Sequence, residues 1–168
     1  VEALKMANNC RFDGVEFDIW YLNSNLVLCH DKPKIDEIAQ LPKLVDYFIF
    51  KNKFYYWLDF KNLNLENIDE VLIKLKNEIN KAQINLKNIY FAPFITDYSI
   101  SAKILIKFRR VFGENINFLA ICEDFKNKGD EVILKNFLNN NKIRHLSIFY
   151  KLIDKKLIDY LGDIELFA

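Results

Sequence analysis

Short apolar segments and amphipathic segments alternate along the whole chain, and this alternation restricts the fold more than any other feature. We expect strands where apolar residues alternate with polar ones or run together, and helices where they recur every three or four positions. The expected strands are 15–21, 26–30, 54–61, 88–94, 117–123, 145–150 and 164–168. The expected helices are 1–8, 34–50, 65–83, 99–112, 130–140 and 155–161, the second interrupted near Pro42.

Repeated strand–helix units predict an α/β fold, with a mainly parallel sheet and helices packed outside it. A closed (β/α)8 TIM barrel takes about 250 residues. Seven strands that begin on a helix fit such a barrel without its first strand. An open doubly wound sheet is the alternative, although the sequence has no Gly-rich phosphate loop after its first strand. We therefore expect a single TIM-barrel-like domain over residues 1–168, truncated at both ends.

Composition excludes several classes of partner. Lys and Arg total 24 against 23 Asp and Glu, with no basic stripe, so we expect no nucleic-acid binding. No apolar run approaches the ~20 residues of a membrane span, so we expect no stable membrane insertion. The three cysteines are odd in number and match no zinc motif, which favours reduced thiols in a cytoplasmic protein. The oligomeric state is left open.

The segment GVEFDIWYLNSNLVLCHD combines a strand pattern with acidic residues and a histidine. Side chains alternate along a strand, so Glu16 and Asp18 share one face. Only about ten residues separate Asp18 from His30, which is too few for a parallel crossover and predicts a hairpin. We expect the hairpin to turn on Asn23–Asn25, and this three-residue loop would pair Asp18 with His30 and bring the histidine onto the carboxylate face. A two-residue loop would put it on the opposite face.

The strand FYYWLDFK repeats this arrangement, because Asp59 and Lys61 share one of its faces. A lone buried carboxylate costs several kcal/mol unless it is paired or bound to metal. A hard divalent cation such as Mg²⁺ or Ca²⁺ would remove the repulsion among Glu16, Asp18 and Asp59, since both ions prefer oxygen ligands. The alternative is a solvated strand edge, or a simple salt bridge between Asp59 and Lys61.

The segments RFDGVEFDIWYLNSNLVLCHD and YWLDFK resemble the signature of the glycerophosphodiester phosphodiesterases. In that family a Glu-x-Asp strand is followed by a short turn and by an apolar strand that ends in His-Asp. The family's next strand ends in an acidic residue, one spacer and lysine. The later segments NIYFAPF, INFLAICED, RHLSIFY and GDIELFA are similar to its remaining strands, more weakly.

The resemblance implies a metal-dependent hydrolase that cleaves a small phosphodiester, either a glycerophosphodiester or a related phospholipid-derived compound. Matched by position, Glu16, Asp18 and Asp59 would bind the divalent metal ion, Mg²⁺ or Ca²⁺. His30 would be one of two catalytic histidines, and Lys61 would help to neutralise the phosphate. The metal would polarise phosphoryl oxygens while histidine moves protons.

Three departures from the family pattern define alternatives. The family's other histidine lies in a His-Arg-Gly motif that this chain lacks, so a missing first strand or a non-catalytic chain are both open. Asp59 stands where the family usually has Glu, as in the sphingomyelinase D branch. Only residues 32–53 precede the next strand, where the glycerol-diester enzymes insert a subdomain. The remaining histidine, His145, is expected to be hydrogen-bonded and partly buried.

Overall fold

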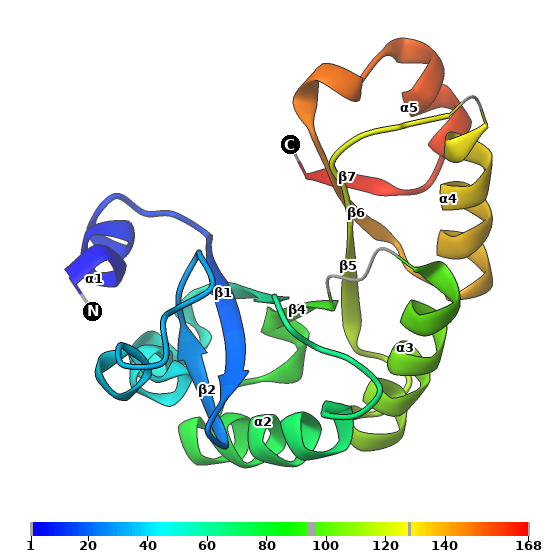
Figure 1. Ribbon diagram of the computed structural model, residues 1–168. Coiled ribbons are helices and arrows are strands. Elements are labelled where there is room, and N and C mark those ends of the chain that lie inside the picture. Colours follow the sequence, from blue (N-terminus) through cyan, green and yellow to red (C-terminus); the bar gives the residue numbers. More distant parts are fainter. Residues whose placement is uncertain (1, 94–96, 128, 168) are drawn as a thin grey trace. The chain divides into compact units, whose positions relative to one another are not determined.

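The computed structural model describes residues 2–93, 97–127 and 129–167 (Figure 1). Contacts divide the chain into two compact units, Val1–Ile116 and Asn117–Ala168. Strands and helices alternate in both units, and most neighbouring strands are parallel, which confirms the α/β fold. The finer expectation of a barrel that lacks its first strand stays a prediction. None of the helices in the described residues is long and apolar enough to cross a membrane.

The first unit holds four strands and the helices that pack on them. Its elements are α1 (Glu2–Asn9), β1 (Gly14–Leu22), β2 (Asn25–Leu28), the 3₁₀ segments η1 (Ile38–Gln40) and η2 (Leu44–Lys53), β3 (Tyr55–Phe60), α2 (Ile68–Ala82), the 3₁₀ segment η3 (Leu86–Asn88), β4 (Ile89–Pro93) and α3 (Tyr98–Phe112). The strand order is β2-β1-β3-β4, with β2 antiparallel to β1 and the other neighbours parallel.

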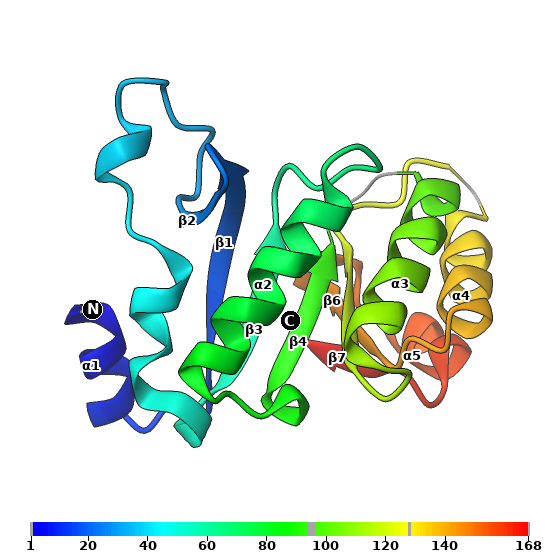
Figure 2. The ribbon, with the colours of Figure 1, turned by 90° about the horizontal axis from the view of Figure 1, so that it is seen from below.

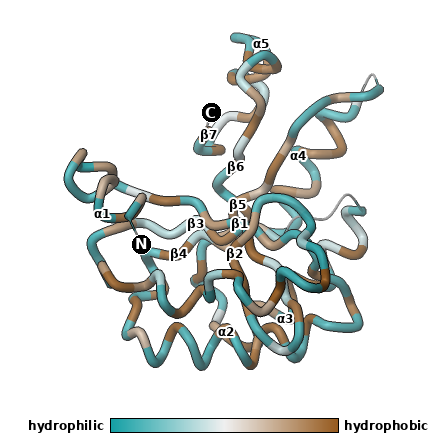
Figure 3. Tube along the Cα trace, turned by 60° about the vertical axis from the view of Figure 1, so that its left-hand side comes forward, coloured by the Kyte–Doolittle hydropathy of each residue, from teal (hydrophilic) through white to brown (hydrophobic). Residues whose placement is uncertain are grey.

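One face of this sheet forms the core of the first unit. Its side chains are apolar, as alternation requires, and α2 and α3 lie side by side against it (Figure 2). The Phe108 ring of α3 lies 5.8 Å from Phe60 of β3 and 5.2 Å from Phe91 of β4, between ring centroids. Helix α2 is amphipathic, with hydrophobic and hydrophilic segments alternating along its trace (Figure 3). The opposite face of the sheet is therefore left for polar side chains.

The hairpin between β1 and β2 differs from the expected one. Its loop has two residues, Asn23 and Ser24, both with positive φ (49° and 59°). Leu22 pairs with Asn25 and Ile19 with Leu28, so the predicted pairing of Asp18 with His30 is wrong by one residue. The physical reason is strand twist, because a two-residue turn with both φ positive matches the right-handed twist of the flanking strands.

The expected helix over residues 34–50 is also wrong. Only the 3₁₀ segments η1 and η2 form there, and η2 contains non-helical backbone at Phe48, Lys51 and Asn52. The backbone near Pro42 pairs with β2 instead of forming a helix, because the Pro42 carbonyl accepts a hydrogen bond from the Leu28 N–H at 2.8 Å. Pairing with β2 therefore prevents a continuous helix.

The second unit contains three parallel strands in the order β5-β6-β7. Its elements are β5 (Asn117–Cys122), α4 (Asp130–Asn140), β6 (His145–Ile148), the 3₁₀ segment η4 (Tyr150–Leu152), α5 (Lys155–Leu161) and β7 (Glu165–Phe167). His145 is mostly buried, with Nδ1 3.3 Å from the Phe118 carbonyl and Nε2 3.4 Å from Glu165. The expectation of a hydrogen-bonded, partly buried histidine is confirmed.

Candidate metal centre

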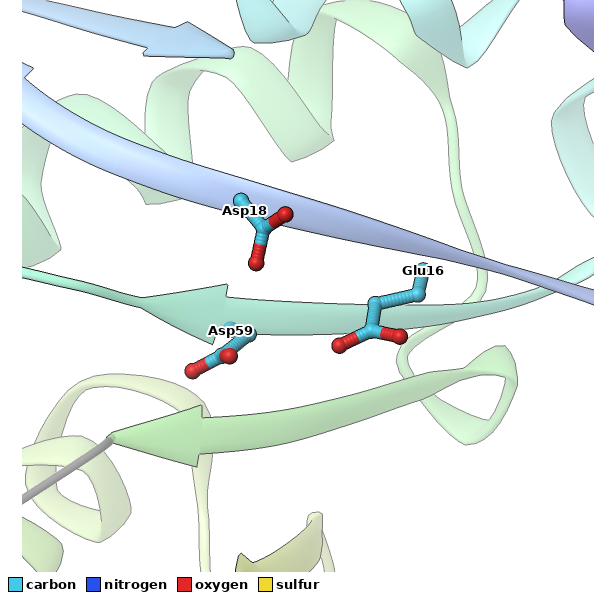
Figure 4. A group of neighbouring side chains, drawn as sticks. All are labelled: Glu16, Asp18 and Asp59. Atoms are coloured by element: carbon cyan, nitrogen blue, oxygen red, sulfur yellow. The ribbon is translucent and has the colours of Figure 1, made fainter. Parts of the chain in front are cut away.

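Two neighbouring parallel strands bring three carboxylates together on the polar face of the first unit. Asp18 of β1 lies directly beside Asp59 of β3 in the strand register, and Glu16 precedes Asp18 by one side-chain period. Figure 4 shows the three carboxylates on the same side of the two strands. One carboxylate oxygen from each lies within 4.8 Å of the others. The convergence expected from the alternation in β1 and β3 is therefore present.

Burial increases across the cluster, from Glu16 to Asp59. Glu16 is exposed, Asp18 is half-buried, and Asp59 is 3 % exposed. Phe17 and Leu58, which are sequence neighbours of the cluster residues, point to the other face of the sheet and are buried in the core against the helices. The cluster is therefore buried at Asp59 and open to solvent at Glu16.

Lys61 supplies the positive charge of the cluster. Its Nζ lies 2.7 Å from Asp18 Oδ1 and 2.5 Å from Asp59 Oδ2, so one ammonium bridges both strands. The salt bridge between Asp59 and Lys61, which the sequence offered as an alternative to a metal site, therefore exists within the carboxylate cluster. When all three carboxylates are ionised, the single positive charge of Lys61 balances one of the three negative charges and leaves two unbalanced.

These charges change the proton affinities of the cluster. Loss of hydration raises the pKa of the Glu16 carboxyl, and repulsion from Asp18 and Asp59 raises it further, whereas Lys61 and His30 act in the opposite direction. Burial opposes the charge on Lys61, but its hydrogen bonds to Asp18 and Asp59 outweigh that effect and raise the pKa of the ammonium. The protein therefore stabilises positive charge at this point.

His30 lies beyond the end of β2, and the strand register does not place it on the carboxylate face. Its side chain is 83 % exposed, and Nδ1 lies 3.1 Å from Asp31 Oδ1. Its positive charge would act against the rise in the pKa of Glu16, as the smallest of the effects on that carboxyl. Of the residues expected from the sequence, the structure joins Glu16, Asp18, Asp59 and Lys61 in one cluster, whereas the convergence of His30 on the same point stays a prediction.

Two side chains that sequence reasoning missed fix the surroundings of the cluster. The Asn62 amide accepts a hydrogen bond from the Tyr21 N–H at 2.8 Å and donates one to the Tyr21 carbonyl at 2.9 Å, extending the contact between β1 and the chain beside Lys61. The Trp20 indole Nε1 donates to the Cys29 carbonyl at 2.9 Å, which holds the backbone before His30. A lone Asn or Trp in a sequence gives no signal for such a role.

The donor set fits a hard divalent cation. Two oxygens on opposite sides of a Ca²⁺ ion, at about 2.4 Å each, are about 4.8 Å apart. The three carboxylate oxygens lie within 4.8 Å of one another, which is the upper limit for any pair of ligands on one ion, and two of the carboxylates already hold the Lys61 ammonium as a cation. Mg²⁺ and Ca²⁺ both prefer oxygen donors of this kind.

Comparison with known proteins adds no assignment. No protein-family model matches the chain, and no curated protein matches its sequence. The resemblance to glycerophosphodiester phosphodiesterases therefore stays a prediction from the motifs quoted above.

Proposed function

We propose that this chain carries the divalent-metal centre of a phosphodiester hydrolase that acts on glycerophosphodiesters or related phospholipid-derived substrates. One observation supports the proposal above all others. Glu16, Asp18 and Asp59 present oxygens within 4.8 Å of one another on the face of the sheet opposite its apolar core. When all three are ionised, Lys61 balances only one of their charges, and the remaining repulsion is costly without a further cation.

Each residue of the cluster has a separate role in this proposal. Glu16, Asp18 and Asp59 would hold Mg²⁺ or Ca²⁺, and the bound metal would polarise the phosphoryl oxygens. Lys61 offsets the negative charge of the phosphate. His30, whose side chain is exposed, would move a proton to or from the reacting oxygens.

Two sequence features favour a second candidate within the same chemistry. Asp59 stands where the glycerophosphodiester phosphodiesterases usually have the longer Glu, and η1 and η2 make up half of the segment between β2 and β3, with no inserted subdomain. Both features favour a sphingomyelinase D-like or phospholipase-like activity. A chain that binds the metal without catalysis is the remaining alternative, because phosphodiester cleavage usually needs two proton-transfer groups and His30 supplies one.

Turnover measurements separate these functions. Release of choline from glycerophosphocholine and from lysophosphatidylcholine is followed with Mg²⁺, with Ca²⁺ and with EDTA. With a single histidine in the cluster region, this chain alone should release choline slowly or not at all; any release should depend on metal, be abolished in Asp59→Asn and fall roughly a hundredfold or more in kcat in His30→Ala. His145→Gln, a change at the histidine of the second unit, is the matched control and should retain the rate.

The outcomes point to different functions. The substrate that is turned over distinguishes the glycerophosphodiesterase from the lysophospholipid-cleaving candidate. Metal binding without turnover of either substrate supports the non-catalytic alternative. Hydrolysis that is unaffected by EDTA and by Asp59→Asn contradicts the proposed metal centre.

A further inference from the structure

Lys61 occupies the position between two of the three carboxylates. Its backbone N–H donates to the Ile19 carbonyl at 2.9 Å, which anchors the residue to β1 immediately after β3 ends. From there its ammonium reaches Asp18 and Asp59 at 2.7 and 2.5 Å, and 24 % of its side chain is exposed. Lysine has four rotatable side-chain bonds, so the ammonium can leave this position without any movement of the backbone.

A divalent cation and the Lys61 ammonium would share the same two carboxylates, Asp18 and Asp59. An ion bound to Asp18 and Asp59 at metal–oxygen distances of about 2.1–2.5 Å would lie beside an ammonium that keeps both of its present hydrogen bonds. Two cations at adjoining positions repel each other strongly in a partly buried site. Lys61 must then give up at least one of its two carboxylate partners.

We propose that Lys61 is the counter-ion of the metal-free cluster, and that a divalent cation releases its ammonium to bind the phosphate group of the substrate. This inference rests on the proposed function. It gives the site an order of binding, with the metal first and the phosphodiester second. Before the metal binds, the two carboxylates hold the ammonium and repel an anionic substrate; afterwards, the metal neutralises them and the ammonium is available.

Amine acetylation of the wild-type chain, mapped by mass spectrometry, reports directly on the release. We expect Lys61 to react slowly without metal and at least about fivefold faster with saturating Mg²⁺, because only an unpaired amine reacts readily. Lys107 is the matched internal control. It lies in the same unit, its Nζ is 2.6 Å from Asp69 Oδ2, and 28 % of its side chain is exposed, so its rate should not respond to Mg²⁺.

Calorimetry tests the order of binding, with inorganic phosphate as the probe. Saturating Mg²⁺ should tighten phosphate binding to the wild type at least about tenfold. Lys61→Met should lose most of this gain while it binds Mg²⁺ at least as tightly as the wild type, because the competing ammonium is gone. Lys61→Arg keeps the charge and should retain part of the gain.

Three results would overturn the inference, and they separate it from the proposed function. The release is refuted, while the metal centre stands, if calorimetry shows that the chain binds Mg²⁺ but the acetylation rate of Lys61 is the same with and without Mg²⁺. If Lys61→Met binds Mg²⁺ more weakly than the wild type does, Lys61 helps to bind the metal and does not compete with it. That result also refutes the release while the metal centre stands. Failure of both proteins to bind Mg²⁺ or Ca²⁺ removes the metal centre and this inference together.

Discussion

Glu78→Gln should stabilise the first unit, by an amount that depends on pH. Glu78 lies on α2 and is 7 % exposed, and among the described residues its Oε2 has no hydrogen-bond partner. Its nearest counter-ion is Lys74, with Nζ 3.8 Å from Oε1. Burial raises the pKa of the Glu78 carboxyl from 4.5 to about 7; Asp46 raises it as well, whereas Lys74, Lys43 and Lys81 lower it.

The sign of the pH dependence follows from the direction of this shift. The folded state takes up the proton more readily than the unfolded state, so the contribution of Glu78 to stability is fully present below about pH 4.5. It is lost as the pH rises to about 7 and stays lost above that. At 1.36 kcal/mol for each pKa unit, the loss is on the order of 3 kcal/mol. Glutamine cannot ionise and should avoid this loss, so the variant should gain about 1–3 kcal/mol at pH 8.5 and little at pH 4.5.

Urea unfolding between pH 4.5 and 8.5, in EDTA, measures this difference. Tryptophan fluorescence is a suitable probe, because the two tryptophans, Trp20 and Trp57, lie in the same unit as Glu78. Glu66→Gln, at an exposed position just before α2, is the matched control and should show no pH-dependent gain. A Glu78→Gln effect that is constant across this pH range, or destabilising at pH 8.5, would refute the reasoning.

Three further changes test the local structure. Ser24→Gly should stabilise the hairpin by up to about 1 kcal/mol in urea unfolding, because glycine adopts the positive φ of 59° without strain; destabilisation would contradict the two-residue turn. Phe108→Ala should cost about 3–5 kcal/mol in the same assay, since the ring is fully buried among aromatic side chains; a loss below 1 kcal/mol would show that α3 does not pack there. At pH 8, Cys122 should react with iodoacetamide much more slowly than the exposed Cys10, because burial raises its pKa to about 11; equal rates in mass spectrometry would contradict that burial.

Side-chain alternation was enough to predict the cluster from sequence. The pattern of β1 and β3 places Asp18 and Asp59 on polar faces, and parallel pairing makes them neighbours. The apolar spacing likewise predicted α2, although the helix begins at Ile68 and the expectation began at residue 65. The Asn64 side chain accepts hydrogen bonds from the backbone N–H groups of Glu66 and Asn67, and this turn occupies the start of the expected helix.

The position of His30 could not be predicted in the same way, because it depends on the length of one turn. Asn and Ser both suit a turn, so the sequence favoured a loop over all three of Asn23, Ser24 and Asn25. The observed turn shortens the loop by one residue, and β2 ends at Leu28, before the histidine. The salt bridge from Lys61 to a second strand could not be predicted from the sequence either, because only the tertiary structure shows that its ammonium reaches Asp18 as well as Asp59.

Calorimetric titration of the chain with Mg²⁺ and Ca²⁺ tests the metal centre most directly. We predict one bound ion per chain and a binding constant at least about tenfold weaker in Asp59→Asn, whose buried carboxylate is replaced by an amide. Asp69→Asn, at an exposed aspartate paired with Lys107 in the same unit, should bind as the wild type does. At a hundredfold excess over Kd the metal should stabilise the wild type by about 2.7 kcal/mol. No heat of binding, together with a Tm that is the same in metal and in EDTA, would contradict the account.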